Sequence, residues 1–453
     1  MNILTTYFLL CLACMLKVNV YSTNPDQTNK CLSNICHTYS YENLNVFNTI
    51  DPKLLQETVA ILSKRFDTNV QIQSVAQLSE SERRNLILRI TLNSPSQDVP
   101  KSLILKQSLI DKTSGDHKAA FDRFVRDWSG LEFLSSLEVE PPLVPRFYGG
   151  SIEHRFVLLE DLGVKHISLV DSLTGQDAKA AEAALKRFME RLGQLHAVSY
   201  GKINHYLKIQ NTLDPDSIRN FTDGKSKSDD LIPKLKPLLN KIDISFTADI
   251  EEEISSVMRA LFEPGPFITF IHGDICPDNV FDNPDKTELR FIDFEWGFLR
   301  NALLDGTYLR MSMPTCWCSR AIPEGLIESL ESTYRQELVK RMPAAQIDDA
   351  YQEAYTAACA FWMLKAILLV EDVLDHDFVW ISGPVSDQSE WKPEANLVRP
   401  RVLSRLQAFI NISKKYDKLP HIRMMAEQIL NTLRSRWPDV KPLELYPAFQ
   451  NDM

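Results

Sequence analysis

The first third of the chain mixes the hydrophobic spacing of helices with that of strands. Apolar residues follow a helical spacing at 51–65, whereas 70–78 alternates between apolar and polar positions and two later runs are short and apolar. The predicted elements are, in order, a helix at 51–65, strands at 70–78, 86–92 and 102–107, a helix at 119–137 and a strand at 156–159. This order predicts a small α+β unit that ends near residue 161.

From residue 177 onward the pattern is mainly helical. Leu185, Phe188, Leu192 and Leu195 fall on one face of a predicted helix, and the polar stretch 211–235 is predicted to be a mobile insertion. Further along, the pattern predicts a helix at 248–262, strands at 267–271, 279–281 and 289–292, and helices from 324 to 437. The second part is therefore predicted to be helical around one small hairpin.

The composition is that of an ordinary globular protein. Of the 453 residues, 44% are hydrophobic and 24% are charged, which excludes a wholly disordered chain. The 60 acidic residues outnumber the 50 basic ones and give a net charge of -10. Because binding to a phosphate backbone requires a basic face, this charge argues against a nucleic-acid partner.

One apolar stretch lies near the start of the chain, at residues 3–16, ahead of Lys17 and a polar segment. Its length suits the core of a signal peptide and is short for a membrane span. No Lys or Arg precedes it, and no clean small-x-small cleavage site follows it. Two interpretations stay open: a signal that exports or anchors the protein, and a stray or mis-started N-terminal extension.

The eight cysteines do not show the spacing of zinc ligands. Cys316 and Cys318 are too close together for an ordinary structural disulfide. Because the cysteines are few in so long a chain, most of them are predicted to be reduced residues of the core.

Residues 272–279 and 292–295 carry the strongest chemical signal. The first segment reads His-Gly-Asp-Ile-Cys-Pro-Asp-Asn, so that Asn279 follows Asp274 by five positions, and a predicted hairpin returns the chain to Asp293. A carboxylate, a carboxamide and a second carboxylate would then meet around a β-turn. Phosphoryl transfer from ATP requires this arrangement, with Asp274 as the base for the acceptor hydroxyl and Asn279 and Asp293 as oxygen ligands of Mg²⁺.

With this motif the chain resembles the aminoglycoside phosphotransferase/choline kinase-like family of small-molecule kinases. Protein kinases carry His-Arg-Asp and Asp-Phe-Gly where this chain has His-Gly-Asp at 272–274 and Asp-Phe-Glu at 293–295. The resemblance extends over residues 55–435 and is strongest at 268–297. It implies an α+β, bilobal, protein-kinase-like fold, with a small mixed N-lobe that contains an antiparallel sheet and a larger, mainly helical C-lobe.

The resemblance also implies a division of the chain and an activity. The expected segments are an N-terminal extension at 1–48, an ATP-binding lobe at 49–161, a helical lobe with the catalytic loop and acceptor site at 162–440, and a tail at 441–453. The implied activity is the ATP- and Mg²⁺-dependent transfer of the γ-phosphoryl group of ATP to a hydroxyl of a small molecule.

An ATP-contacting lysine is expected on the third strand, and the run 102–107 supplies Lys106. An unpaired ammonium in an apolar strand costs several kcal/mol, so Lys106 is expected to have an acidic partner on the helix that follows. Asp127 stands where the family usually has Glu and is one methylene shorter, and Glu132 is the alternative. The choice between these two acids stays open.

The stretch Leu-Leu-Glu-Asp-Leu-Gly at 158–163 is similar to the family's link between the two lobes. Adenine would be bound there by backbone N–H and C=O groups near Glu160 and Leu162. Such groups are present in every residue, so the identity of the side chains matters little for this contact.

The turn at 79–84 departs from the nucleotide-binding loops of other kinases. It contains no glycine, and therefore neither a GxGxxG motif nor a Walker loop is present. Phosphate contacts would come from backbone N–H groups or from Ser81 and Arg83.

Three residues are expected to brace the site rather than to react. His196 matches a helical Leu-x-x-Leu-His-Ala stretch that is typical of the family and is expected to pack beneath the catalytic loop. His272 is expected to brace the loop through ring hydrogen bonds, because Asp274 is better placed to act as the base. Asp305 stands where the family has a later structural acid.

Few features of the sequence indicate which acceptor the protein binds. Acidic residues gather at 371–377, and either they attract a cationic group or they belong to a solvated helix end. Trp317, Trp362, Trp380 and Trp391 either form a cage for an apolar or quaternary-ammonium substrate or are ordinary core aromatics.

Two rival functions stay open beside the small-molecule kinase. One is a catalytically inactive binding module that kept the fold, and the other is a kinase that modifies proteins on the same scaffold. The need for ATP predicts a cytoplasmic protein, with export or membrane anchoring through residues 3–16 as the alternative. The expected partner is a small-molecule hydroxyl acceptor, and a membrane is expected only if the apolar segment is retained as an anchor.

Overall fold

The computed structural model describes residues 50–79, 84–110, 115–215, 224–380, 391–392 and 396–450. The apolar stretch at 3–16 lies outside the described residues, and so do Ser81 and Arg83. The chain forms two compact units, which divide between Asp161 and Leu162. Residues Val125–Arg146 belong to the second unit, whereas the sequence placed them in the first.

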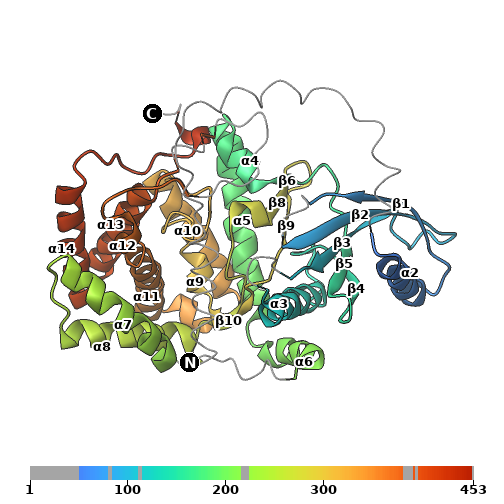
Figure 1. The fold of residues 1–453 in the computed structure, drawn as a ribbon, viewed down its shortest axis with the longest axis horizontal. Coiled ribbons are helices and arrows are strands. Elements are labelled where there is room, and N and C mark those ends of the chain that lie inside the picture. Colours follow the sequence, from blue (N-terminus) through green and yellow to red (C-terminus); the bar gives the residue numbers. More distant parts are fainter. Residues whose placement is uncertain are drawn as a thin grey trace. The chain divides into compact units, whose positions relative to one another are not determined.

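The first unit is built on a five-stranded antiparallel sheet with the strand order β1-β2-β3-β5-β4 (Figure 1). The strands are β1 (Gln71–Gln77), β2 (Asn85–Asn93), β3 (Ser102–Ser108), β4 (Phe147–Ser151) and β5 (Phe156–Glu160). On β2 every second residue from Leu88 to Leu92 is buried, as expected for a strand with one face on a core. Helix α2 (Pro52–Phe66) adds Leu54 and Leu62 to the same core.

Helix α2 agrees with the predicted helix at 51–65 to within one residue at each end. Asp51 accepts a hydrogen bond from the Lys53 backbone N–H at 3.0 Å, and Pro52 occupies the first turn, where its missing N–H costs nothing. Asp67 closes the helix in the left-handed conformation. Helix α3 (His117–Ser135) follows the sheet strand β3, and its C-terminal part belongs to the second unit.

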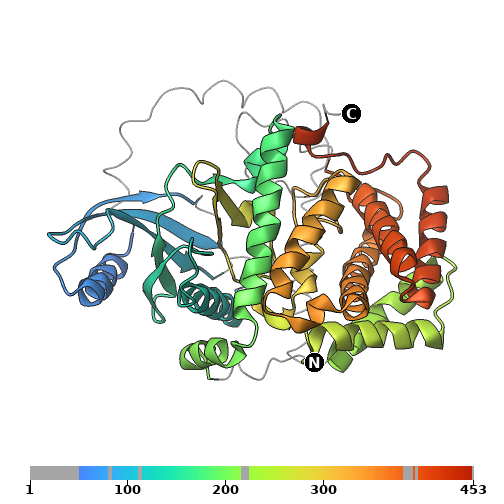
Figure 2. The same cartoon turned by 180° about the vertical axis from the view of Figure 1, so that it is seen from behind.

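The second unit is mainly helical. Its helices are α4 (Leu169–Thr174), α5 (Ala178–Ser199), α6 (Ile203–Leu213), α7 (Gly224–Lys241), α8 (Ala248–Phe262), α9 (Leu303–Gly306), α10 (Glu324–Val339), α11 (Asp348–Ile367), α12 (Val370–Val373), α13 (Val398–Tyr416) and α14 (Pro420–Arg436). Helices α5 and α10 lie side by side, as both views show (Figures 1 and 2). They pack so closely that a Cβ added to Gly193 would lie 2.6 Å from Glu337 Cβ.

The prediction of a mobile insertion at 211–235 is wrong for its second half. Residues 224–235 lie in α7, and residues 216–223 lie outside the described part of the chain. Leu231, Ile232 and Leu235 are buried, because the polar residues of this segment occupy one side of an amphipathic helix. The run of polar residues at the start of the segment concealed that spacing.

Short strands complete the second unit. Strands β6 (Ile167–Ser168), β8 (Val280–Asn283) and β9 (Glu288–Phe291) form one sheet, and β7 (Ile268–Ile271) pairs with β10 (Phe298–Asn301). The hairpin β8–β9 was predicted, whereas β6 and β10 were not. The predicted α+β fold, with an antiparallel sheet first and a mainly helical second part, is confirmed.

None of the helices within the described ranges is long and apolar enough to cross a bilayer.

Candidate active site

The loop at 272–279, which the sequence predicts to be catalytic, follows β7 and contains a glycine that the backbone requires. Gly273 has a φ of +78°, in the left-handed region that favours glycine. A Cβ at this position would lie 2.4 Å from the backbone oxygen of Trp296. The glycine of the His-Gly-Asp motif therefore lets the loop approach the chain that follows the Asp-Phe-Glu motif.

Asp305, in α9, holds the start of this loop. Its carboxylate is fully buried and accepts hydrogen bonds from the backbone N–H groups of His272 at 2.6 Å and Gly273 at 3.1 Å. On its other side, Asp305 Oδ2 lies 3.4 Å from His196 Nε2, and His196 Nδ1 lies 2.7 Å from the Tyr334 hydroxyl. A buried carboxylate with several donors is costly to remove, so this cluster fixes the loop on the helices beneath it.

His272 links the loop to the Asp-Phe-Glu turn. Its Nε2 donates to the backbone oxygen of Ile292 at 2.8 Å, so Nδ1 is left to accept the backbone N–H of Asp274 at 3.4 Å. Burial lowers the pKa of His272, which favours the neutral ring that these two contacts need. In this geometry His272 spans the two motifs and its ring nitrogens are both engaged.

Asn279 and Asp293 come to the same end of the hairpin. Val280 on β8 pairs with Phe291 on β9, and the Asn279 backbone oxygen accepts from the Ile292 N–H at 3.0 Å. The Asn279 side-chain nitrogen donates to the backbone oxygen of Asp274 at 2.9 Å. Because the amide nitrogen is engaged within the loop, the side-chain oxygen of Asn279 is the atom left for a ligand.

The Asp-Phe-Glu turn is anchored by Phe294. Asp293 adopts a φ of +66°, and the next residue buries its ring 4.6 Å from the His272 ring. The backbone N–H of Phe294 donates to Asp127 Oδ1 at 2.8 Å, and Arg126 Nε donates to the backbone oxygen of Glu295 at 2.7 Å. Two neighbouring residues of α3 thus fix the turn that presents Asp293.

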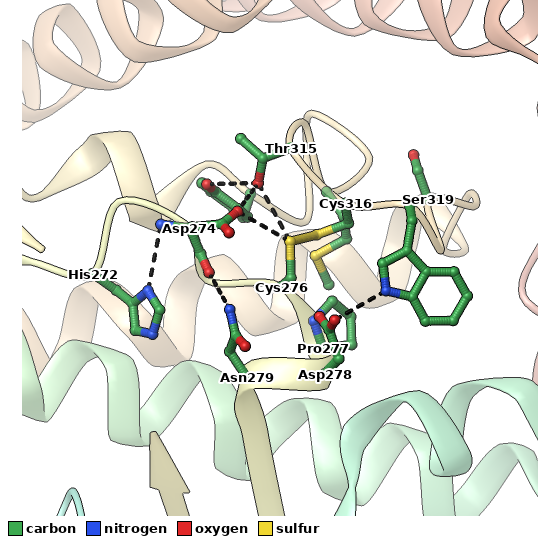
Figure 3. The surroundings of a disulfide bond; sticks show 12 residues. His272, Asp274, Cys276, Pro277, Asp278, Asn279, Thr315, Cys316 and Ser319 are labelled. Carbon is green, nitrogen blue, oxygen red and sulfur yellow. Dashed lines mark hydrogen bonds between the residues drawn. A yellow bond between two sulfur atoms is a disulfide. The ribbon is translucent and has the colours of Figure 1, made fainter. Parts of the chain in front are cut away.

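Asp274, which belongs to this loop, contacts a second segment that the sequence analysis did not connect with the loop (Figure 3). Its Oδ1 accepts a hydrogen bond from the Thr315 hydroxyl at 2.5 Å. Burial raises the pKa of Asp274 to about 8, the Thr315 hydrogen bond opposes this rise, and the charges of Asp278, Asp293 and Glu295 add to it. Four carboxylates thus concentrate negative charge at this place.

The donor set suits a divalent cation of the Mg²⁺ type. Mg²⁺ prefers oxygen ligands and is usually held by one or two carboxylates together with substrate phosphates. The Asn279 amide oxygen and the Asp293 carboxylate are ligands of this kind, and a cation would offset the repulsion among the neighbouring carboxylates. Over the described ranges no group of three or more His, Cys, Asp or Glu residues is arranged to hold a metal ion.

The residues expected to contact the nucleotide from the first unit lie on adjacent strands. Lys106 is buried on β3, opposite Ile87 of β2 and Val157 of β5. Glu160 is the last residue of β5 and pairs with Leu103.

The other residues expected near the nucleotide belong to the second unit. The backbone oxygen of Leu162 lies 2.8 Å from His166 Nδ1. Of the two acids considered for Lys106, Glu132 accepts from the Trp128 indole N–H at 2.6 Å, whereas Asp127 binds the Asp-Phe-Glu turn.

A disulfide joins the catalytic loop to the segment that carries Thr315. Cys276 and Cys316 are bonded, with their Cα atoms 5.4 Å apart (Figure 3). The expectation of reduced cysteines is therefore wrong for this pair, whereas Cys318 and Cys359 are free and buried as predicted. Spacing along the chain could not reveal the pair, because 40 positions separate its members.

Sequence reasoning missed the residues that surround Asp274 from this second segment. Thr315, Cys316 and Trp317 reach the loop, and the Trp317 indole N–H donates to Asp278 Oδ2 at 3.0 Å. The sequence marks this second segment only by its Thr-Cys-Trp-Cys run. No rule of spacing connected the threonine with the aspartate.

The structure changes the interpretation of the tryptophans. The face of Trp391 is covered by Arg320 and that of Trp380 by Arg401, with guanidinium carbons 4.2 Å and 5.3 Å from the ring centroids. Trp362 is buried against Tyr308. These contacts favour ordinary core aromatics over a cage for a cationic substrate, because the protein's own cations already contact two of the rings.

The acidic residues at 371–377 have structural partners. Asp377 accepts from the backbone N–H groups of Val398 at 3.1 Å and Arg399 at 3.2 Å, at the start of α13. Glu371 forms an exposed ion pair with Lys241 at 3.2 Å. These contacts favour the solvated helix end over a binding site for a cation.

Comparison with known families identifies the class of the protein. The phosphotransferase enzyme family (APH) matches residues 74–326, which is more than half of the chain. The protein therefore belongs to this family, and the prediction of its membership is confirmed. The matched region contains the His-Gly-Asp and Asp-Phe-Glu segments together with Lys106 and Thr315.

Several solved structures are similar to the chain at low identity. An ethanolamine kinase from Plasmodium vivax is 12% identical, with a TM-score of 0.39 over 80% of this chain and 85% of that one. A choline kinase from Cryptosporidium parvum is 13% identical, with a TM-score of 0.38 over 84% and 98%. A macrolide 2'-phosphotransferase is 12% identical, with a TM-score of 0.37 over 71% and 93%. No curated protein matches the chain by sequence.

Proposed function

We propose that this protein transfers the γ-phosphoryl group of Mg-ATP to a hydroxyl group of a small molecule. The observation that carries the proposal is the joining of two motifs by Asn279, whose side chain binds the backbone of Asp274 and whose backbone binds Ile292, next to Asp293. In a member of a phosphotransferase family, this geometry supports the proposal that Asp274 is a base and that Asn279 and Asp293 are oxygen ligands around the same turn.

Asp274 is the proposed catalytic base. Thr315 occupies Oδ1, so Oδ2 is the oxygen that would accept the proton of the acceptor hydroxyl. The phosphoryl group passes through a loose transition state, and the protein therefore contributes mainly by positioning and by electrostatic stabilisation.

Asn279 and Asp293 are the proposed Mg²⁺ ligands. When bound, the ion would neutralise charge on the phosphate oxygens. Two features of the chain position these ligands. The β8–β9 hairpin fixes the backbone next to Asn279 and Asp293, and the buried Phe294 fixes the Asp-Phe-Glu turn.

Lys106 is proposed to bind the α- and β-phosphates, with Asp127 or Glu132 as its acidic partner. Its burial on an apolar strand supports this role, because a buried ammonium needs a compensating charge. Backbone groups near Glu160 and Leu162 are proposed to bind adenine. The engagement of Asp127 by Phe294 also couples the Asp-Phe-Glu turn to α3.

The test is ADP release with Mg-ATP over a panel of hydroxylated acceptors, comparing the wild type with Asp274→Asn. We expect acceptor-dependent release that falls by about 10²- to 10⁴-fold in the variant, because the substitution removes the base. Asp285→Asn is the matched control, since Asp285 is exposed in the β8–β9 turn and pairs only with Lys165 among the contacts described. Loss of release on chelation of the metal and recovery with Mg²⁺ would support the proposed ligands.

Two other outcomes would replace the proposal. Binding of Mg-ATP without turnover on any small molecule, together with phosphorylation of added proteins, would indicate a protein-modifying kinase. Failure of both turnover and nucleotide binding would indicate an inactive binding module on the same fold.

The compartment is part of the same proposal. The use of ATP favours the cytoplasm, whereas the Cys276–Cys316 disulfide favours an oxidising compartment, which export through residues 3–16 would provide. N-terminal sequencing of the mature protein distinguishes the two, because a cleaved signal removes that stretch.

A further inference from the structure

Three consecutive residues bind three alternate residues of the catalytic loop. Thr315 donates to Asp274, Cys316 is bonded to Cys276, and Trp317 donates to Asp278. Both cysteines of this disulfide are buried. We call residues 315–317 the clamp.

The clamp is itself fixed from the other side. Arg401, which is 2% exposed, donates to the backbone oxygens of Cys316 at 2.8 Å and Trp317 at 2.6 Å. Arg405, also on α13, donates to the backbone oxygen of Met311 at 3.0 Å. Arg401 therefore holds two consecutive carbonyls of the clamp, and Arg405 holds the chain just before it, so that the clamp is a rigid support for the loop that it contacts.

The Thr315 hydroxyl restricts the carboxylate of Asp274. A free carboxylate rotates about its Cβ–Cγ bond, and a hydrogen bond of 2.5 Å to one oxygen limits that rotation. The Tyr308 hydroxyl lies 3.1 Å from both Thr315 Oγ1 and the Gly273 backbone oxygen, so the threonine is held in place as well.

Building on the proposed function, we infer that Thr315 is a positioning residue for Asp274 and that the Cys276–Cys316 disulfide keeps it in position. The disulfide acts in two ways. It fixes the residue next to Thr315 to the loop, and it removes the thiol proton of Cys276, whose Sγ lies 3.3 Å from Asp274 Oδ1. In the dithiol form the Cys276 S–H would compete with Thr315 for that oxygen.

Reduction converts the disulfide form of the protein into the form with two free thiols. A dithiol reagent breaks the S–S bond and transfers two electrons and two protons to Cys276 and Cys316, and the reagent itself becomes a disulfide. Loop geometry, and with it kcat, is then expected to depend on the redox state of this pair.

The first experiment tests the hydroxyl. Thr315→Val removes the donor at nearly constant volume, and kcat is expected to fall by about 10- to 100-fold while the KM for Mg-ATP stays within about twofold. Thr315→Ser restores the donor and is expected to recover kcat to within about threefold. Thr356→Val is the matched control, because it removes a buried hydroxyl that donates to Gln352 on α11, and it is expected to leave kcat unchanged.

The second experiment tests the disulfide. Alkylation and mass spectrometry establish the state of each cysteine, while kcat and the hydrogen exchange of the loop amides are followed during reduction by dithiothreitol. Reduced wild type and Cys316→Ala are expected to lose kcat by about three- to tenfold and to exchange the amides of 273–279 faster. Cys318→Ala, a buried free cysteine two positions away, is expected to behave like the wild type.

The outcomes separate this inference from the function on which it rests. An active wild type with an unaffected Thr315→Val variant, or a Thr315→Ser variant that does not recover, overturns the role of Thr315. Full kcat after proven reduction overturns the role of the disulfide. A wild type that transfers no phosphoryl group to any acceptor, small molecule or protein, refutes the proposed function and this inference together.

Discussion

The sheet of the first unit and the catalytic loop of the second are stabilised by different kinds of interaction. The sheet covers a core of aliphatic side chains, such as Leu88, Ile90 and Leu105, which are fully buried. The loop rests on buried polar groups, above all Asp305 and His196, with specific donors and acceptors. An apolar core tolerates substitutions of similar volume. In a buried hydrogen bond, by contrast, the loss of the donor or of the acceptor leaves the other group unsatisfied.

The largest effect is expected at the centre of the polar cluster. Asp305→Ala leaves the backbone N–H groups of His272 and Gly273 without an acceptor and should lower the free energy of unfolding by about 3–5 kcal/mol. Urea denaturation followed by tryptophan fluorescence measures the loss. Asp305→Asn, which keeps one acceptor oxygen, should lose less, and equal losses for the two variants would contradict the assigned hydrogen bonds.

An aliphatic cavity in the sheet should cost slightly less. Leu88→Ala removes a fully buried side chain that lies opposite Leu105 on β3, and a loss of about 3 kcal/mol is expected. Leu88→Met keeps the volume and should cost less than about 1.5 kcal/mol. If the two variants were equally unstable, the core would depend on shape as strictly as the loop depends on its hydrogen bonds, and the contrast between the units would disappear.

Backbone geometry should matter more in the loop than elsewhere. Gly273→Ala combines an unfavourable positive φ with a contact of 2.4 Å to the Trp296 oxygen, and a loss of about 2 kcal/mol together with a lower kcat is expected. Gly201→Ala is the control, because Gly201 has a φ of +74° and no other atom lies within 4 Å of the added Cβ. Its cost should be about 1 kcal/mol, and similar costs at the two glycines would exclude a role for the close approach.

The smallest effect is expected where the first unit uses charge. Arg89 on β2 forms a two-point ion pair with Asp161, at 2.8 Å and 3.2 Å, but 36% of its side chain is exposed. Arg89→Met keeps the apolar stem and should change the free energy of unfolding by less than about 1 kcal/mol, with a smaller effect at high salt. A loss as large as that of Asp305→Ala would show that polar contacts are equally important in both units.

Sequence patterns predicted the elements whose signal is local. The alternation at 70–78, the apolar run at 86–92 and the helical spacing of Leu185, Phe188 and Leu192 each extend over a short stretch of chain. The two chemical motifs are also joined by a local feature. The short β8–β9 hairpin brings Asn279 near Asp293 without help from the rest of the fold. These features follow from periodicity and from short loops, and both can be read along the chain.

Contacts between distant segments gave no such signal. Asp127 binds Phe294 over 167 positions, Thr315 binds Asp274 over 41, and the disulfide closes a separation of 40. Leu231 and Leu235 looked like part of a polar insertion until their helix was seen to bury them. A hydrogen bond or a sulfur bridge needs its two atoms within a few ångströms, and the folding of the whole second unit decides which residues meet. The sequence therefore determined the family of the protein and the residues proposed to react, whereas only the tertiary structure decided which neighbours hold those residues in place.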